Sequence, residues 1–352
     1  MTAVPRLPLL AILLLGRASA CDSTVGPASS LPGFEAQLEG LRQKLHIPGM
    51  SAAIAKDGRV VWSRGFGFAD REEQRAASDT TSYHMASLTK TMGSTILTQL
   101  VEAGRVGLDD PVSRFGIQLA SPGVITVRHL LTHTSEDTPG AQFRYNGDRF
   151  GLLDAVVSSA SGSSFGALSV EQIIRRLELR HTAPNPDAPA FALTGLDAQA
   201  FRRNLAQGYN SDGKSRLSYP GYFGMAAGMV SSVLDLARFS IAIDSGAFLR
   251  PETWNQVFTP QVSVSGGTLP HALGWFVRQE QGVTLQWHYG FWIGNSSLLI
   301  RVPSRKLTFV LLANNDMLSR NTSLGEGNLL SSPLAKAFVG AFVTGTAPLP
   351  SK

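Results

Sequence analysis

The sequence predicts an α+β fold, in which an antiparallel sheet is flanked by helices and a helical domain is inserted into it. Strand character occurs near both ends of the chain, within residues 50–70 and again within residues 272–315. The stretch between about residues 80 and 179 has mainly helical periodicity. Strands that flank a helical block are typical of one discontinuous domain that carries an insertion, and a cleft is expected where the two parts meet.

The chain has 352 residues, which suits two domains or one large domain. Hydrophobic residues make up 43% and charged residues 16%, the balance of an ordered globular protein. The formal net charge of +5 falls to +3 if a leader containing Arg6 and Arg17 is removed. This charge is too small, and the basic residues are too scattered, to indicate nucleic-acid binding. A single cysteine, Cys21, excludes an internal disulfide.

The first twenty residues have the order of a secretory signal: an early positive charge at Arg6, the apolar run "LPLLAILLLG", and then "RASA". The apolar run is too short to cross a bilayer as a helix, so we expect export, to the periplasm or outside the cell. Two interpretations of Cys21 stay open: the signal is cleaved after Ala20, or a lipid on Cys21 tethers the protein to the membrane. We expect residues 1–20 to be the signal peptide and residues 21–33 a Ser/Pro/Gly tether.

A helix and a hairpin are expected next. Apolar residues recur at helical spacing within residues 34–45, and the pattern ends at Pro48. Two strands follow within residues 50–70, joined by Asp57-Gly58, a dipeptide that suits a two-residue hairpin turn because it accepts positive φ. The sheet is therefore expected to begin with an antiparallel pair.

The remaining elements set the domain boundaries. The Pro-rich segment "TAPNPDAPA" ends the helical block near residue 190, and a helix of small residues is expected within residues 224–243. Late strands and a final helix, "PLAKAFVGAF", complete the chain. We assign residues 34–80 and 190–345 to a discontinuous sheet domain and residues 81–189 to a mainly helical domain.

Two serines fit nucleophile motifs but lack the right setting. Ser164 stands in a Gly-x-Ser-x-Gly pattern, which needs a strand before the serine, and the residues before Ser164 look helical. Ser211 and Lys214 form a Ser-x-x-Lys pattern around Asp212-Gly213. That dipeptide indicates a turn, and a turn does not bring the two side chains together as a helix does.

A third serine, Ser87, is followed by Lys90 at the start of an expected helix, where residues three apart share one face. The lysine amine can therefore reach the serine hydroxyl. Burial makes an amine a usable base, whereas the helix dipole contributes only about 0.3–1 kcal/mol, so burial of Lys90 must supply most of the activation. The alternative is a capping serine beside a solvated lysine, and the four-residue pattern alone does not decide between them.

Six segments in chain order resemble the serine β-lactamase and penicillin-binding protein superfamily. They are "IPGMSAAIAKDGRVVWSRGFGFAD", "SLTK", "ITVRHLLTHTS", "LAQGY", "AAGMVSSVLDLARF" and "ALGWFV". They are most similar to the branch that holds class C β-lactamases, D-Ala-D-Ala carboxypeptidases and β-lactamase-like esterases. The matches run from about residue 34 to 315. The resemblance implies a β-lactamase/transpeptidase-like fold and a catalytic serine.

The resemblance also implies catalytic roles. Ser87 corresponds to the acylated nucleophile and Lys90 to its partner. In "FRYNGDRFGLL", Tyr145 falls on the tyrosine of the family's second motif, Tyr-x-Asn. Such a phenol assists proton transfer to and from the serine and the leaving group. The alternative for Tyr145 is a core tyrosine.

The third motif of the family, Lys-Thr-Gly on an edge strand, corresponds to His288, Tyr289 and Gly290. We expect Gly290 to let a substrate lie against the strand and Tyr289 to line the substrate site. The backbone N–H groups of Ser87 and Phe291 would form the oxyanion hole, in which one donor is typically worth about 10²–10³ in rate. The alternative for His288 is a structural histidine.

The sequence departs from the family at the second motif. Gly147 stands where the motif has its asparagine, and Asn146 is adjacent; both are expected near the substrate. "HTSED" has Glu136 in place of the usual glycine, followed by Asp137. A neutral His288 offers less than lysine to the carboxylate of penicillins and D-Ala-D-Ala peptides. We therefore expect classical β-lactamase activity to be weak or absent.

The sequence thus predicts an exported serine hydrolase that cleaves an ester, amide or peptide through an acyl-enzyme on Ser87. Two alternatives remain: a class C-like β-lactamase or D-Ala-D-Ala carboxypeptidase, and a non-catalytic penicillin-binding or sensor protein. His129 and His133 lie four residues apart without a third ligand, so no metal is expected, and no other cofactor is expected. The sequence does not indicate an oligomeric state.

Overall fold

A computed structural model describes Met1 and residues 28–350. The expected signal peptide, Cys21 and most of the tether lie outside the described residues. Within them, no helix has both the length and the apolar character needed to cross a membrane.

A seven-stranded antiparallel sheet forms the centre of the molecule, in the order β3-β2-β1-β10-β9-β8-β7. Its strands are β1 (Gly49–Lys56), β2 (Arg59–Asp70), β3 (Arg75–Ala76), β7 (Phe276–Glu280), β8 (Val283–Trp292), β9 (Asn295–Val302) and β10 (Leu307–Ala313). The two ends of the chain meet in the middle of this sheet, where Met50 of β1 lies opposite Ala313 of β10. The prediction of an α+β fold around one antiparallel sheet built from both ends of the chain is confirmed.

The hairpin between β1 and β2 turns at Asp57-Gly58, as expected. Both residues have positive φ, 51° at Asp57 and 80° at Gly58. This conformation gives a two-residue loop the twist of the strands that it joins.

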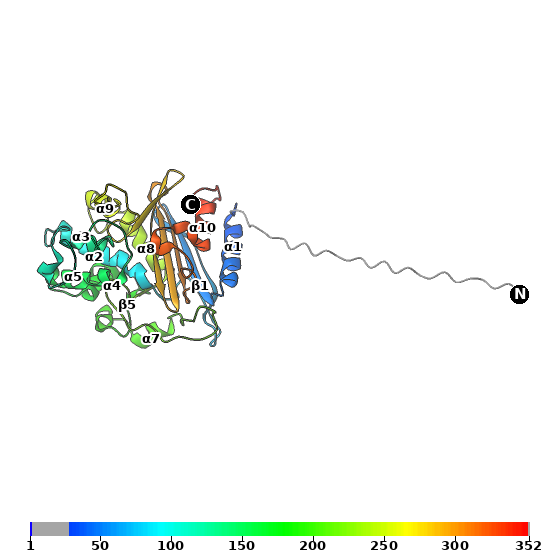
Figure 1. Cartoon of the computed structure of the whole chain (residues 1–352). Coiled ribbons are helices and arrows are strands. Elements are labelled where there is room, and N and C mark those ends of the chain that lie inside the picture. Colours follow the sequence, from blue (N-terminus) through cyan, green and yellow to red (C-terminus); the bar gives the residue numbers. More distant parts are fainter. Residues whose placement is uncertain (2–27, 351–352) are drawn as a thin grey trace.

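Helices α1 (Leu31–Lys44) and α10 (Pro333–Phe342) lie side by side on one face of the sheet (Figure 1). Phe34 of α1 packs edge-on against Phe309 of the sheet and Phe342 of α10, with ring centroids 5.7 and 5.0 Å away. Helix α1 begins three residues before the expected start, because the Ser30 hydroxyl accepts the Gly33 N–H at 3.2 Å and caps the first turn.

The other face of the sheet is covered by α8 (Val233–Asp244), beyond which the mainly helical part of the chain lies (Figure 1). That part contains α2 (Thr89–Glu102), α3 (Val127–Leu131), α4 (Gly147–Gly151), α5 (Leu153–Ser161), α6 (Phe165–Ser169), α7 (Ala198–Arg203) and α9 (Pro251–Val257). Helix α2 is enclosed on nearly all sides, which the small side chains along it permit.

A second sheet, in the order β4-β6-β5, joins three distant segments: β4 (Tyr83–His84), β5 (Ala183–Pro184) and β6 (Met229–Ser231). The helix expected within residues 224–243 therefore begins only at Val233, because residues 229–231 form β6 and Ser232 caps α8. This sheet links residues 229–231 to β4 and β5, which lie within residues 81–189.

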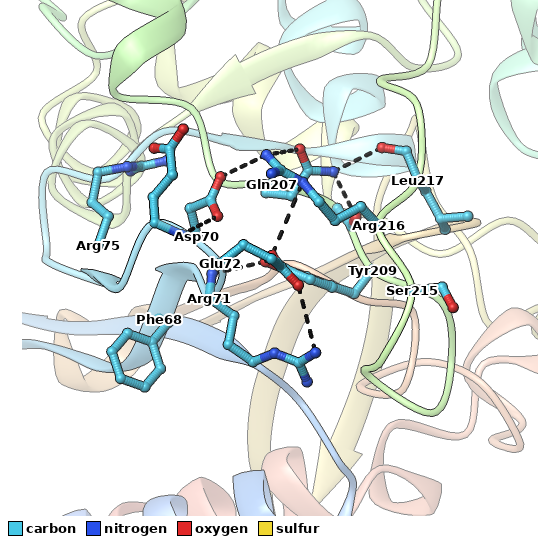
Figure 2. A network of polar contacts seen from close by, with 12 residues as sticks. Phe68, Asp70, Arg71, Glu72, Arg75, Gln207, Tyr209, Ser215, Arg216 and Leu217 are labelled. Carbon is cyan, nitrogen blue, oxygen red and sulfur yellow. Dashed lines mark hydrogen bonds and ion pairs between the residues drawn. The ribbon is translucent and has the colours of Figure 1, made fainter.

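Polar contacts anchor the connection between α7 and β6 to the end of β2 (Figure 2). Arg216 forms an ion pair with the buried Asp70 at 2.8 Å. The Tyr209 hydroxyl accepts the Arg71 N–H at 2.8 Å and donates to Glu72. The segment after α7 is therefore held against the end of β2.

Candidate active site

Ser87 lies in the short 3-10 turn Ala86–Leu88, directly before α2. Ala86 has a φ of 49°, a left-handed conformation that is unusual for a residue with a side chain. The Ala86 N–H is bonded to Nδ1 of the buried His84 at 3.1 Å, which helps to hold this turn. Strained backbone of this kind is frequent at functional sites, and here it presents the hydroxyl of Ser87, which is partly exposed.

The Lys90 side chain is fully buried in the first turn of α2, with an exposure of 0%. Its Nζ lies 2.9 Å from Ser87 Oγ and 2.8 Å from the Ala226 carbonyl oxygen. The rings of Tyr145 and Phe150 face the same amine, with centroids 5.2 and 5.3 Å from Nζ. The contact expected between the serine and the lysine is therefore present.

Burial lowers the pKa of Lys90 to about 7, against a smaller opposite effect of the Asp148 carboxylate. At that pKa a large fraction of the amine is neutral at neutral pH. A neutral amine can donate one hydrogen to the Ala226 carbonyl and keep its lone pair for the Ser87 hydroxyl. The geometry thus suits Lys90 as the proton acceptor for Ser87.

Tyr145 lies just before α4, partly exposed, but its hydroxyl oxygen is buried and has no hydrogen-bond partner among the described residues. Burial raises the pKa of Tyr145 well above its usual range, and Tyr289 adds to this, whereas the nearby Ser87 hydroxyl acts in the opposite direction. The phenol is therefore protonated at neutral pH and can serve as a proton donor.

Strand β8 lies directly against the turn that carries Ser87. The pairing of β7 with β8 ends at Trp287, so the last residues of β8 pair only with β9. A side chain on Gly290 would overlap the Met85 carbonyl oxygen and Ser297 Oγ, and Ser297 Oγ itself donates to that carbonyl at 2.6 Å. The expected oxyanion donors, the N–H groups of Ser87 and Phe291, thus stand on two segments in direct contact.

Gly290 and Tyr289 of the third motif both make packing contacts within the protein. The side-chain position of Gly290 is filled by the protein itself, so the glycine is needed for packing of the strand on the nucleophile turn. The Tyr289 ring lies 5.6 Å from the Tyr145 ring, and its hydroxyl is next to Gly325. Tyr289 therefore packs beside the Tyr145 ring.

His288 is fully buried, and its Nδ1 lies 2.6 Å from the Tyr289 carbonyl oxygen. Because a carbonyl only accepts hydrogen bonds, Nδ1 carries the proton and Nε2 is the bare nitrogen. Nε2 has no partner among the described residues. Burial, with the positive charge of Lys90, lowers the pKa of His288 well below its usual range. The imidazole is therefore neutral, unlike a lysine at this position.

Asn146 points away from Lys90. Its Oδ1 accepts the Arg149 N–H at 2.9 Å and caps α4, and its amide donates to Glu136. The site of a Cβ on Gly147 lies 3.8 Å from Lys90 Nζ, and among the described residues outside its own helix and its chain neighbours no other atom lies within 4 Å of it. Gly147 thus occupies the position that faces the lysine, and the site lacks an amide there.

The other motif residues are not brought to this site. Ser164 caps α6, since its Oγ accepts the Ala167 N–H at 3.2 Å. The Lys214 N–H bonds to Asp212 in a surface turn. His129 caps α3 through Thr126. The sequence pattern did not indicate the Ala226 carbonyl, because a backbone group leaves no residue-type signal.

A model of the family described as Beta-lactamase matches residues 34–322. The chain belongs to the Beta-lactamase family. It is 25% identical over 318 residues to the protein flp of Staphylococcus aureus strain MW2, a match that covers 77% of this chain and 60% of flp, less than two thirds. It is 23% identical over 315 residues to the putative penicillin-binding protein PbpX of Bacillus subtilis strain 168, covering 79% of this chain and 73% of PbpX.

The fold is also similar to that of a solved structure, the octameric penicillin-binding protein homologue from Pyrococcus abyssi. The TM-score is 0.74 at 22% sequence identity, covering 88% of this chain and 77% of that chain. At this identity the likeness concerns the fold alone.

Replacing Gly290 with alanine is expected to force β8 and the nucleophile turn apart. Overpacking of this kind typically costs about 1–3 kcal/mol of stability, and a displaced oxyanion donor costs about 10²–10³ in rate. We expect Gly290→Ala to unfold at a lower temperature and to react at least about a hundredfold more slowly with a fluorophosphonate. Gly221→Ala is the control, because nothing lies within 4 Å of its side-chain position. Equal reactivity of both variants would contradict this packing role.

The rate of fluorophosphonate labelling is expected to rise with pH around a midpoint near 7, because only the neutral amine of Lys90 accepts the Ser87 proton. The free energy of unfolding should also rise with pH between about 7 and 10.5, since in that window the unfolded lysine binds a proton that the folded lysine has lost. Lys90→Met should lose labelling and flatten this part of the stability profile. A labelling rate that is constant from pH 6 to 8 would exclude this role of Lys90.

Proposed function

We propose that this protein hydrolyses esters or amides through an acyl-enzyme on Ser87. The observation that carries the proposal is the Lys90 amine, which is buried, has a pKa lowered to about 7 and lies 2.9 Å from Ser87 Oγ. A serine hydroxyl is a weak nucleophile until a neighbouring base accepts its proton. A solvated lysine could not do this at neutral pH.

The proposed acylation step moves one proton from the nucleophile to the leaving group. Ser87 Oγ attacks the substrate carbonyl while its proton passes to Lys90, and the N–H groups of Ser87 and Phe291 bind the oxyanion. Tyr145 gives its proton to the departing oxygen or nitrogen and recovers one from Lys90. Water then attacks the acyl-enzyme with the same groups in reverse order, which regenerates Ser87.

The neutral and acidic residues around Ser87 favour a substrate without a carboxylate. His288 is neutral, and Gly147 brings no amide toward Lys90. Glu136 and Asp137 add negative charge to the neighbouring loop, where both face Arg144 at 3.4 and 3.1 Å. Recognition of a penicillin or D-Ala-D-Ala carboxylate is therefore weakened.

Apolar side chains gather where β8 turns into β9, next to the expected oxyanion donor. Phe291 is 40% and Ile293 64% exposed, and the ring of Tyr222, also 40% exposed, stacks on Trp292 at 5.9 Å. Exposed apolar groups at the rim of a site commonly bind apolar parts of a ligand. We therefore propose a neutral ester with an apolar acyl or alcohol group as the preferred substrate.

A second candidate is a D-Ala-D-Ala carboxypeptidase or class C-like β-lactamase. The similarity to PbpX, a putative penicillin-binding protein, favours it. A non-catalytic penicillin-binding or sensor protein is the third candidate, and it is favoured by the missing amide at Gly147.

Intact-mass measurement after exposure to a fluorophosphonate is expected to show one adduct on the wild type and none on Ser87→Ala. In parallel, short p-nitrophenyl esters should be hydrolysed far faster than a chromogenic cephalosporin. The reverse order would favour the β-lactamase or carboxypeptidase. No adduct on the folded wild-type protein, with either a fluorophosphonate or a penicillin, would overturn every enzymatic proposal for Ser87.

Gly147→Asn is expected to place an amide next to Lys90 and to increase the rate of acylation by penicillin. A single added hydrogen bond is worth about 1 kcal/mol, so we expect roughly a fivefold to tenfold gain. Gly147→Ala is the matched control, because it fills the same space without an amide. If both variants react with penicillin at the wild-type rate, the missing asparagine does not limit β-lactam recognition.

A further inference from the structure

Three neutral imidazoles lie in one buried cluster beside Tyr145. They are His133 from the loop after α3, His271 from the connection before β7, and His288 from β8. The His133 ring is 4.2 Å from the Tyr145 ring and 4.9 Å from the His271 ring, and His288 is 6.2 Å from Tyr145. Burial lowers the pKa of each of the three histidines. His288 belongs to the third motif and His133 begins the segment "HTSED", whereas His271 belongs to none of the motifs described above.

The backbone assigns opposite tautomers to these histidines. His133 Nδ1 accepts the Asn146 N–H at 3.1 Å, so Nδ1 is bare and the proton is on Nε2. His271 Nδ1 lies 2.8 Å from the Ala272 carbonyl oxygen, so there the proton is on Nδ1 and Nε2 is bare, as in His288. Each of the three Nδ1 atoms thus has a backbone partner, and the partner of His133 is the N–H of the residue that follows Tyr145.

His133 holds the chain on both sides of Tyr145. Its Nδ1 accepts the N–H of Asn146, and its carbonyl oxygen accepts the N–H of Arg144 at 2.8 Å. Its ring covers the Tyr145 ring with an angle of 31° between the planes. His133 itself has a φ of 54°, a conformation in which histidine, asparagine and aspartate are more frequent than aromatic or apolar residues.

We propose that His133 is a positioning residue for Tyr145. It fixes the backbone at both neighbours of the tyrosine and lies against its ring, and so keeps the Tyr145 hydroxyl where it can give a proton to the leaving group and recover one from Lys90. The inference rests on the proposed role of Tyr145 in catalysis. An apolar side chain of similar size would fill the same space but would leave the Asn146 N–H without its imidazole acceptor.

The test compares His133→Phe with His133→Asn. Phenylalanine keeps the ring but removes the acceptor, so we expect kcat for a p-nitrophenyl ester to fall about 10–100-fold with little change in KM, since misplacing an acid–base group costs part of its contribution. Asparagine can place an oxygen near the position of Nδ1 and tolerates the left-handed φ, so it should restore most of kcat. In a Tyr145→Phe background the effect of His133→Phe should disappear.

His46→Phe is the matched control, because His46 also has a left-handed φ, 52°, and lies between α1 and β1 outside the site. It should lose stability without losing kcat. Full kcat in folded His133→Phe, or equal losses of kcat in the presence and absence of the Tyr145 hydroxyl, would overturn the positioning role.

Nitrogen-15 NMR of the histidine side chains tests the same arrangement without an activity measurement. We expect the Nε2–H tautomer for His133 and the Nδ1–H tautomer for His271 and His288. An Nδ1–H tautomer at His133 would overturn the inference even if Ser87 forms its adduct. Conversely, a failure of the Ser87 adduct with the expected tautomers would reject the proposed hydrolase and leave the histidine arrangement standing.

Discussion

The Lys90 amine is enclosed by α2, the Tyr145 and Phe150 rings, and the chain that carries Ala226. A charged amine in such a place loses its hydration without gaining a carboxylate in direct contact, so burial favours the neutral form. The neutral form is the one that can accept a proton from Ser87 Oγ, 2.9 Å away.

Beside the turn that bears Ser87, the two parts of the molecule pack tightly at one glycine. Gly290 of β8 leaves just enough room for the Met85 carbonyl and for Ser297, so the turn that bears Ser87 lies on the strand that bears Phe291. The strand belongs to the large sheet and the turn leads into the helical part. The site therefore exists only when both parts are folded against each other.

The site around Ser87 combines a neutral third motif with a second motif that lacks its amide. His288 is held neutral by burial. The Asn146 side chain caps α4 and donates to Glu136, and the adjacent Gly147, which has no side chain, lies next to Lys90. His133 contacts the second motif through the Asn146 N–H and the Tyr145 ring. The family fold is thus kept, with a neutral imidazole and a glycine at these two motif positions.

Local patterns in the sequence determined much of this protein: the Asp57-Gly58 hairpin, the strands at both ends of the chain, and the contact of Ser87 with Lys90, which follows from helical spacing. Only the tertiary structure decided that residues 229–231 form a strand, that the side-chain position of Gly290 is filled by the protein itself, and that His271 meets His133. The physical reason is the distance along the chain between the residues that interact. Hairpins and helical neighbours depend on a few adjacent residues, whereas burial, strand pairing and the pKa of Lys90 depend on groups brought together from distant parts of the chain.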